Sequence, residues 1–294
     1  MSKIIQGLVG VLTLGFAFAV QAGGTLADPA ASADWNADST WSGGAKPVAG
    51  EAVMVLPTGD ITLTMSADST NDYASLYFRS SVAKTTAASL TFDGRGYKLL
   101  MPYSANGYYV GAPFKILDAD EKEAFKLDDS KLDAADKIKA APILFDDARF
   151  KISQDTAGAV TFRMDSGTLN ACNPAGTAYA LREILMSNGS QPFRFELVNG
   201  AKAVFPKLYA GYTKPGSMLF DNAELTVHGA LQFGRDNYYY SESALVLAAT
   251  NTTFVCGGAV GFYHTATNVF KDCTIDIAGE MVNSWNSSVT FENC

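Results

Sequence analysis

The chain of 294 residues is 48% apolar, 18% charged and 12% aromatic, which excludes a disordered polar tail and a protein with several membrane spans. Its 30 acidic against 22 basic residues give a formal charge of −8, which argues against a nucleic-acid partner because neutralising phosphates takes clustered cations. With only 2 histidines, most zinc and Ser-His-Asp chemistry is excluded, whereas 26 glycines and many aromatic residues favour β structure.

The first 22 residues predict a secretory signal peptide. Lys3 precedes an apolar stretch over residues 4–20, and Val-Gln-Ala at 20–22 has the small-x-small pattern of a cleavage site. An uncleaved anchor is the alternative, but we expect removal of residues 1–22 and a secreted or cell-surface protein that starts near Gly23. No second stretch is apolar enough to span a bilayer, so we expect no membrane span in the mature chain.

Residues 23–64 predict a polar segment followed by capping strands. Trp35 and Trp41 come before two short alternating runs, one around Val53 and one around Ile61. A stack of β-strands needs its first layer covered, and two indole rings make an efficient cover. Sugar stacking on either tryptophan is the alternative reading.

A repeated sequence motif, called the phrase below, is the most informative feature of the second half of the chain. A recurring unit of roughly 20–30 residues decides the fold class. Its anchors are Asn222, Asn251, Asp272 and Asn293. After each anchor the next residue is small, the third and fifth are apolar and the seventh is glycine, as far as the sequence extends. The same phrase appears over residues 145–152, and a looser copy around Asn199 fits if one residue is bulged.

The repeat predicts an all-β fold, a right-handed parallel β-helix (β-solenoid) over residues 65–294. Coils stacked about 4.8 Å apart bring like residues into register, which a β-sandwich does not do. We therefore expect the four anchors to form a structural ladder at a corner between two strands. Two apolar columns would line the interior: Leu225, Phe254 and Ile275, and Val227, Cys256 and Ile277.

The segment 117–139 interrupts the pattern with eight acidic and five basic residues. Its apolar residues are spaced as one helical stripe, so we expect a charged helical or loop insertion. Asp118 and Asp120 have the spacing of calcium ligands, but the glycine and the final glutamate of a calcium loop are missing. The sequence therefore predicts no metal site and no cofactor.

Four cysteines remain in the mature chain: Cys172, Cys256, Cys273 and Cys294. There is no Cys-x-x-Cys motif, so we expect small buried residues of a β core instead of redox or metal chemistry. Cys273 and Cys294 fall in one column and are expected to be neighbours. Three disulfide pairings remain open, and stacked free thiols are equally compatible with the spacing.

The N-terminal half carries a family resemblance. The phrase Trp-Ser-Gly-Gly at 41–44, then Pro47, Gly50-Glu51 and Val53, precedes Ser-Leu-Thr-Phe-Asp-Gly at 89–94 and the anchored coils. This combination of motifs resembles the passenger regions of bacterial autotransporter-like surface proteins. The resemblance implies a right-handed parallel β-helix and a role in adhesion. The chain departs from it in lacking a C-terminal run of amphipathic membrane strands.

The phrase stops in mid-coil at Cys294, from which we expect either a fragment of a longer protein or a last coil covered by a capping partner.

Exposed aromatic residues are the best indication of binding. We expect Tyr238, Tyr239 and Tyr240 in a loop within the 29-residue gap between two anchors, and Tyr108 and Tyr109 in another glycine-flanked loop. Tyrosine offers a flat apolar face and a hydroxyl group, which suit a glycan or a cell-surface protein. Packing of these rings onto the coils is the alternative.

An enzyme is the second hypothesis, because parallel β-helices include polysaccharide lyases and glycoside hydrolases. Asp146 and Asp147 are the adjacent carboxylates in a coil, but alternation along a strand is expected to send only one of them to a given groove. His228-Gly229 lacks the rest of a catalytic Gly-His-Gly motif. We therefore expect a non-enzymatic adhesion or structural protein, with no catalytic residues assigned.

Overall fold

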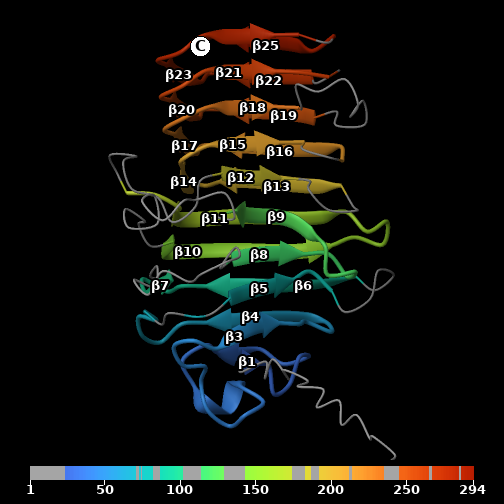
Figure 1. Cartoon of the computed structure of the whole chain (residues 1–294), viewed down its shortest axis with the longest axis vertical. Coiled ribbons are helices and arrows are strands. Elements are labelled where there is room, and N and C mark those ends of the chain that lie inside the picture. Colours follow the sequence, from blue (N-terminus) through green and yellow to red (C-terminus); the bar gives the residue numbers. More distant parts are fainter. Residues whose placement is uncertain are drawn as a thin grey trace, which may run out of the picture.

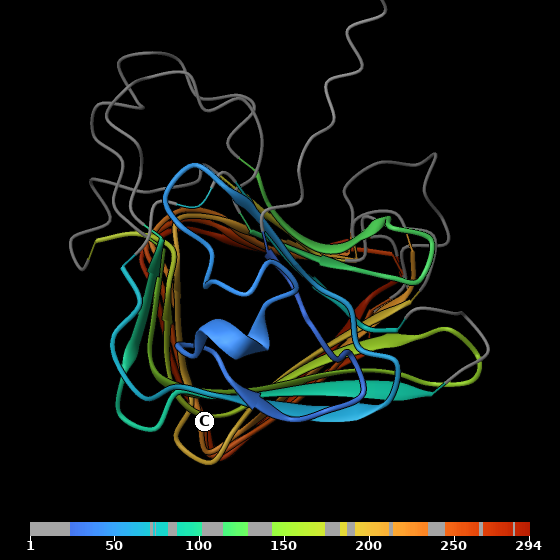
Figure 2. The same cartoon turned by 90° about the horizontal axis from the view of Figure 1, so that it is seen from below.

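The computed structural model describes residues 24–70, 73, 75–81, 87–101, 114–128, 143–173, 183–186, 192–211, 214–234, 245–264, 267–284 and 286–294. In this part of the chain the structure is all-β apart from one short 3-10 turn, η1 (Asp38–Thr40). Figure 1 shows the strands stacked in layers along the long axis, with the N-terminal strands at one end and the C-terminal strands at the other. Viewed along that axis, the layers superimpose on a three-sided outline (Figure 2).

The strands line three faces. The first face is a 10-stranded sheet: β1 (Gly24–Thr25), β3 (Ala52–Val55), β5 (Ser75–Arg79), β8 (Phe114–Leu117), β9 (Glu123–Asp128), β12 (Glu183–Met186), β15 (Leu208–Ala210), β18 (Leu231–Phe233), β21 (Val260–Phe262) and β24 (Met281–Asn283). The second face is the main path of a 15-stranded sheet: β2 (Ala33–Asp34), β4 (Asp60–Thr64), β6 (Ala88–Asp93), β10 (Ile143–Gln154), β11 (Val160–Asn170), β13 (Phe193–Val198), β16 (Gly216–Asp221), β19 (Leu245–Thr250), β22 (Thr267–Lys271) and β25 (Ser288–Glu292).

The third face belongs to the same 15-stranded sheet, which bends at a corner. Its own strands are β7 (Lys98–Met101), β14 (Lys202–Phe205), β17 (Glu224–Val227), β20 (Thr253–Cys256) and β23 (Thr274–Ile277). The long strands β10 and β11 cross the corner and supply one half to each of these two faces.

From β13 onward every layer follows the same path: second face, third face, first face. The strands of successive layers are parallel and in register, with Leu225 opposite Phe254, and Phe254 opposite Ile275. The column of Val227, Cys256 and Ile277 is aligned in the same way. Both predicted apolar columns and the parallel pairing are therefore confirmed, and the arrangement is compatible with a β-solenoid.

The anchor residues form the corner between the second and third faces because they adopt a left-handed backbone. Asn222, Asn251, Asp272 and Asn293 have φ values between 47° and 54°. Asparagine and aspartate tolerate this conformation better than other residues with a Cβ. In the looser copy both Asn199 (φ 57°) and Gly200 (φ 88°) are left-handed, and this extra residue is the predicted bulge. Ala203 consequently takes the place opposite Leu225.

One layer in the middle of the stack is traversed in the opposite direction. Strand β9 is antiparallel to β8 and β12, and β10 is antiparallel to β6, β7 and β11. The phrase over residues 145–152 therefore lies on a strand that runs against its neighbours, which the repeat did not predict. At its corner, the left-handed Gly167 (φ 77°) of β11 lies against Asp147, whose carbonyl oxygen would be 2.2 Å from any added Cβ.

Two turns of identical design bound this reversed layer. In the first, one carboxylate oxygen of Asp118 accepts hydrogen bonds from the backbone N–H groups of Asp120 (2.9 Å) and Lys122 (3.0 Å). In the second, Asp155 accepts from Ala157 and Ala159, both at 2.9 Å. Aspartate side chains stabilise turns in this way by replacing a backbone acceptor. Each turn returns the chain antiparallel to the strand that it has just left.

The first of these turns corrects the prediction for segment 117–139. Residues 123–128 form strand β9, so a helix or an irregular loop is wrong for them. Ala124, Phe125 and Leu127 are buried in the core on this strand. Residues 129–139, the rest of the predicted insertion, lie outside the described part of the chain.

Aromatic rings run through the core from one end of the stack to the other. Successive ring centroids along this path are 5.0–6.2 Å apart, in stacked, tilted and edge-to-face arrangements. The path passes through Trp41, Trp35, Phe92, Phe150, Phe162, Phe195, Phe220, Phe254, Phe270 and Phe291. Burying such a side chain contributes about 1.5–3 kcal/mol, so this row is a main source of stability.

The N-terminal end is closed by the two tryptophans. Their rings meet edge to face at 5.0 Å and are 2% and 1% exposed. The indole N–H of Trp41 donates to the carbonyl oxygen of Trp35, and that of Trp35 donates to the hydroxyl of Ser69. Both rings are covered by protein, so neither offers a free face on which a sugar could stack.

Candidate functional site

The anchor ladder is a regular polar feature on the surface of the described residues. The side-chain amide of Asn251 donates to Oδ1 of Asn222 at 3.3 Å, and that of Asn293 donates to Oδ1 of Asp272 at 3.1 Å. All four side chains are exposed at the corner between the second and third faces. The four anchors are thus joined in two hydrogen-bonded pairs, each of which links neighbouring layers.

The tyrosines predicted to bind a ligand, Tyr238, Tyr239, Tyr240, Tyr108 and Tyr109, all lie outside the described residues. Their role therefore stays a prediction.

The two carboxylates of the enzyme hypothesis, Asp146 and Asp147, both lie on the outer side of the sheet. Strand alternation had predicted that they would lie on opposite sides. Asp147 is itself a left-handed corner residue (φ 47°), and a corner breaks the alternation, so Asp146 and Asp147 both face solvent. Asp146 lies 3.8 Å from the ammonium group of Lys98. Asp147 accepts a hydrogen bond from the backbone N–H of Gly96 at 2.7 Å. Asp146 thus fastens the start of β7, and Asp147 the turn before it, to the reversed layer.

Asp118, which has the spacing of a calcium ligand relative to Asp120, has a structural role in a turn. Asp118 is fully buried and its carboxylate holds the turn that leads into β9. Within the described ranges, no group of three or more His, Cys, Asp and Glu side chains is arranged to hold a metal ion.

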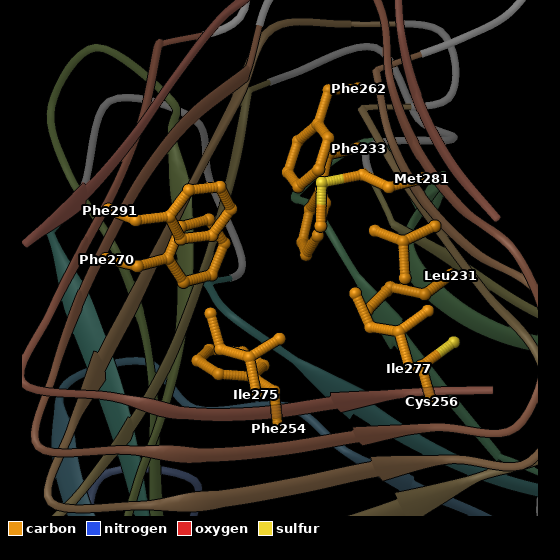
Figure 3. Close-up of a pocket in the computed structure, with 11 residues that line it drawn as sticks. Leu231, Phe233, Phe254, Cys256, Phe262, Phe270, Ile275, Ile277, Met281 and Phe291 are labelled. Carbon is orange, nitrogen blue, oxygen red and sulfur yellow. The ribbon is translucent and has the colours of Figure 1, made fainter. Parts of the chain in front are cut away.

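An apolar hollow opens at the C-terminal end of the stack (Figure 3). Its floor is formed by buried residues, among them Phe254, Cys256 and Phe270, each 2–3% exposed. Met281 of β24 and Phe291 of β25, the last strands of the first and second faces, are 46% and 44% exposed. The residues that line the hollow are Leu231, Phe233, Phe254, Cys256, Val260, Phe262, Phe270, Ile275, Ile277, Met281 and Phe291.

The rim of this hollow is a backbone edge. Among the described strands, β23 pairs only with β20, β24 only with β21 and β25 only with β22. Their outer N–H and C=O groups are therefore available to another β-strand, and such an edge favours pairing with further β structure.

All four cysteines are free thiols, so none of the three disulfide pairings is formed. Cys172, Cys256 and Cys273 are buried, as predicted for small core residues, whereas Cys294 is exposed. Burial raises the pKa of Cys172 to about 12, so this thiol stays protonated and unreactive near neutral pH.

A small polar pocket near the N-terminal cap was not predicted from the sequence. Its lining combines the tryptophan cap with charged and hydroxyl groups, and consists of Trp35, Asn36, Lys46, Asp68, Ser69, Thr70 and Tyr73. Several of these groups are occupied by internal hydrogen bonds. Asn36 Oδ1 accepts from the N–H groups of Ser66 and Ala67, and Asp68 accepts from that of Lys98.

Comparison with known proteins identifies no relative: no family model, no curated protein and no solved structure matches the chain. No helix among the described residues is long and apolar enough to cross a membrane.

Proposed function

We propose that the protein is an exported, non-enzymatic right-handed parallel β-helix, similar to autotransporter-like passengers, that acts in adhesion or as a structural surface element. The single observation that carries this proposal is the stacking of equivalent residues in successive layers. The anchor side chains bond to one another along the corner, and the apolar columns fill the interior. The side chains of the regular half thus maintain a rigid stack, which is suited to displaying loops.

Export is supported by the sequence of residues 1–22, which has the charge, the apolar core and the small-x-small end of a cleaved secretory signal. Expression of the full chain in a secreting host tests it. Edman sequencing of the exported product should begin near Gly23. Retention of the intact N-terminus in the cell contradicts the proposal.

The contacts with glycans or cell-surface proteins are assigned to the loops that carry Tyr238–Tyr240 and Tyr108–Tyr109. The test compares binding of the mature chain to a glycan array and to cells, before and after changing Tyr238, Tyr239 and Tyr240 to alanine. Tyr97→Ala is the matched control, because Tyr97 is 38% exposed in a short turn elsewhere on the stack. Loss of binding in the triple variant alone supports the assignment, and unchanged binding contradicts it.

A capping partner for the C-terminal layer is proposed as well. The apolar hollow together with the unpaired edges of β23, β24 and β25 fits a partner that adds a β-strand and an apolar side chain. Phe291→Asp places a charge in the hollow and is expected to abolish such binding while the rest of the stack remains folded. A partner retained by this variant contradicts the proposal.

A polysaccharide lyase or glycoside hydrolase is the alternative, favoured by the solvent-facing position of both Asp146 and Asp147. Glycosidases use two carboxylates on one side of the scaffold. The test is release of reducing or unsaturated ends from a panel of acidic and neutral glycans. Activity lost on Asp147→Asn, at unchanged thermal stability, favours the enzyme. No release from the panel by the wild-type chain favours the non-enzymatic function.

A further inference from the structure

Cys273 and Cys294 occupy equivalent positions in the last two layers. Each follows a left-handed corner residue, Asp272 (φ 54°) or Asn293 (φ 53°), so both side chains leave the backbone in the same local geometry. Adjacent strands lie about 4.8 Å apart, and a disulfide bridges Cα atoms about 4.4–6.8 Å apart. The backbone spacing therefore admits a bond between these two cysteines.

Hydrogen bonds hold the two layers in register at this point. The N–H of Asp272 donates to the carbonyl oxygen of Glu292 at 2.8 Å, and the side chain of Asn293 donates to that of Asp272 at 3.1 Å. Phe270 and Phe291 stack with their centroids 5.2 Å apart. The cysteines are thus kept opposite each other by the same contacts that form the corner.

The two thiols are directed at carbonyl oxygens of the same corner. Cys273 Sγ donates to the carbonyl oxygen of Lys271 at 3.3 Å. Cys294 Sγ lies 3.3 Å from the carbonyl oxygen of Glu292 and 3.4 Å from that of Phe270, which belongs to the layer of Cys273. Burial raises the pKa of Cys273, and the adjacent Cys294 raises it further.

We propose that Cys273 and Cys294 form a redox-controlled disulfide that links the last two layers and closes the turn of chain formed by β23, β24 and β25. This inference is independent of the proposed function. Cys294 is the exposed thiol and reacts first, whereas Cys273 is buried and completes the bridge.

The oxidant is a small external disulfide such as oxidised glutathione. The Cys294 thiolate attacks one of its sulfurs and expels one glutathione thiolate, giving a mixed disulfide. Cys273, after losing its proton, attacks the Cys294 sulfur and expels the second glutathione thiolate. The two thiolates take up the two protons, so two cysteine thiols are oxidised while one glutathione disulfide is reduced to two thiols.

The test treats the reduced, purified chain with graded ratios of oxidised to reduced glutathione, then alkylates the remaining thiols and maps them by mass spectrometry. The proposal predicts loss of two alkylatable thiols, located at Cys273 and Cys294, and an intramolecular product. Amides of β25 should exchange with solvent about tenfold more slowly in the oxidised chain. Cys172→Ala and Cys256→Ala should leave this result unchanged.

Cys273→Thr is the variant that removes the bridge and keeps the corner. Thr252 occupies the equivalent position one layer below and makes the same bond, from its hydroxyl to the carbonyl oxygen of Thr250 (2.8 Å). In Cys273→Thr the oxidised protein should carry glutathione on Cys294. Three outcomes overturn the proposal: four alkylatable thiols in the oxidised wild-type chain, a persistent mixed disulfide on its Cys294, or a dimer joined through Cys294.

Discussion

Replacing Gly258 by alanine tests how closely the layers approach each other. A Cβ at this position would lie 2.7 Å from the carbonyl carbon of Gly229 and 2.8 Å from its oxygen, in the layer below. Ordinary contact begins at 3.4 Å, so the two layers would have to separate locally by about 0.7 Å. The bond from the Gly257 N–H to the carbonyl oxygen of Val227 (2.8 Å) resists this shift. An added methyl group without room costs about 1–3 kcal/mol, and we expect about 2 kcal/mol here.

Thermal unfolding and hydrogen exchange measure this cost. A loss of about 2 kcal/mol lowers the Tm by roughly 4–8 °C in a chain of this size, and raises the opening of the affected amides about 30-fold. The increase should be confined to β17, β20 and their neighbours, because each layer contacts only adjacent layers. Gly59→Ala is the control, since nothing lies within 4 Å of its added Cβ. If both variants change the Tm equally, the close approach of the layers is refuted.

Four further changes have defined outcomes. Asn251→Ala should lower the free energy of unfolding in urea by about 1 kcal/mol because alanine disfavours the left-handed corner, whereas Asn251→Gly should cost clearly less. Phe254→Ala should cost about 3–5 kcal/mol by the same measurement, but Val246→Ala, at a 57% exposed position, less than about 0.5 kcal/mol. Asp155→Ala should cost about 1–2 kcal/mol and increase hydrogen exchange in the β10–β11 hairpin, because two N–H groups lose their acceptor. Burial raises the pKa of Cys172 from 9.0 to about 12, so its contribution to stability should be complete below pH 9 and decline toward pH 12; Cys172→Ala should flatten this decline in pH-dependent unfolding.

The regular half of the fold could be predicted because its residues are repeated in space as they are in sequence. Leu225 and Phe254 share a column, so each demands an apolar partner above and below it. The positions of the corner anchors could be predicted, but the reason why they form a corner could not. That reason is the left-handed backbone of residues such as Asn251, which only the structure displays. Burial of the small residues after the anchors follows from the same bend.

The reversed layer could not be predicted from the repeat. A corner flanked by alternating apolar residues, as in Phe145 to Ile152, has the same pattern read in either direction, so it does not encode the direction of a strand. That information lies in the two turns that begin at Asp118 and Asp155. The spacing that indicated a weak calcium site was in fact part of a turn that reverses the chain. The helical stripe over 117–139 was misleading for a related reason, because a short strand with Phe125 and Leu127 buried also fits that spacing.

The candidate site was less predictable than the fold. The binding role of the tyrosines is inferred from side-chain chemistry alone. The predicted directions of the Asp146 and Asp147 side chains depended on the alternation of side chains along a strand, and this alternation fails at a corner. The apolar hollow at the C-terminal end was expected only as an open coil, and its lining follows from the three-dimensional path of the strands.

Electron-spin distances along the third face test the central claim, the in-register stacking of layers, most directly. Labels are attached through a non-natural amino acid at Thr168 and, in turn, at Glu224, Thr253 or Thr274, which leaves the native cysteines unchanged. These positions are aligned across β11, β14, β17, β20 and β23. The mean separation should therefore grow by about 4.8 Å with each layer, to about 19 Å for the pair 168 and 274. Separations that fail to increase in this order, or that exceed this range by more than the length of the labels, would contradict the account.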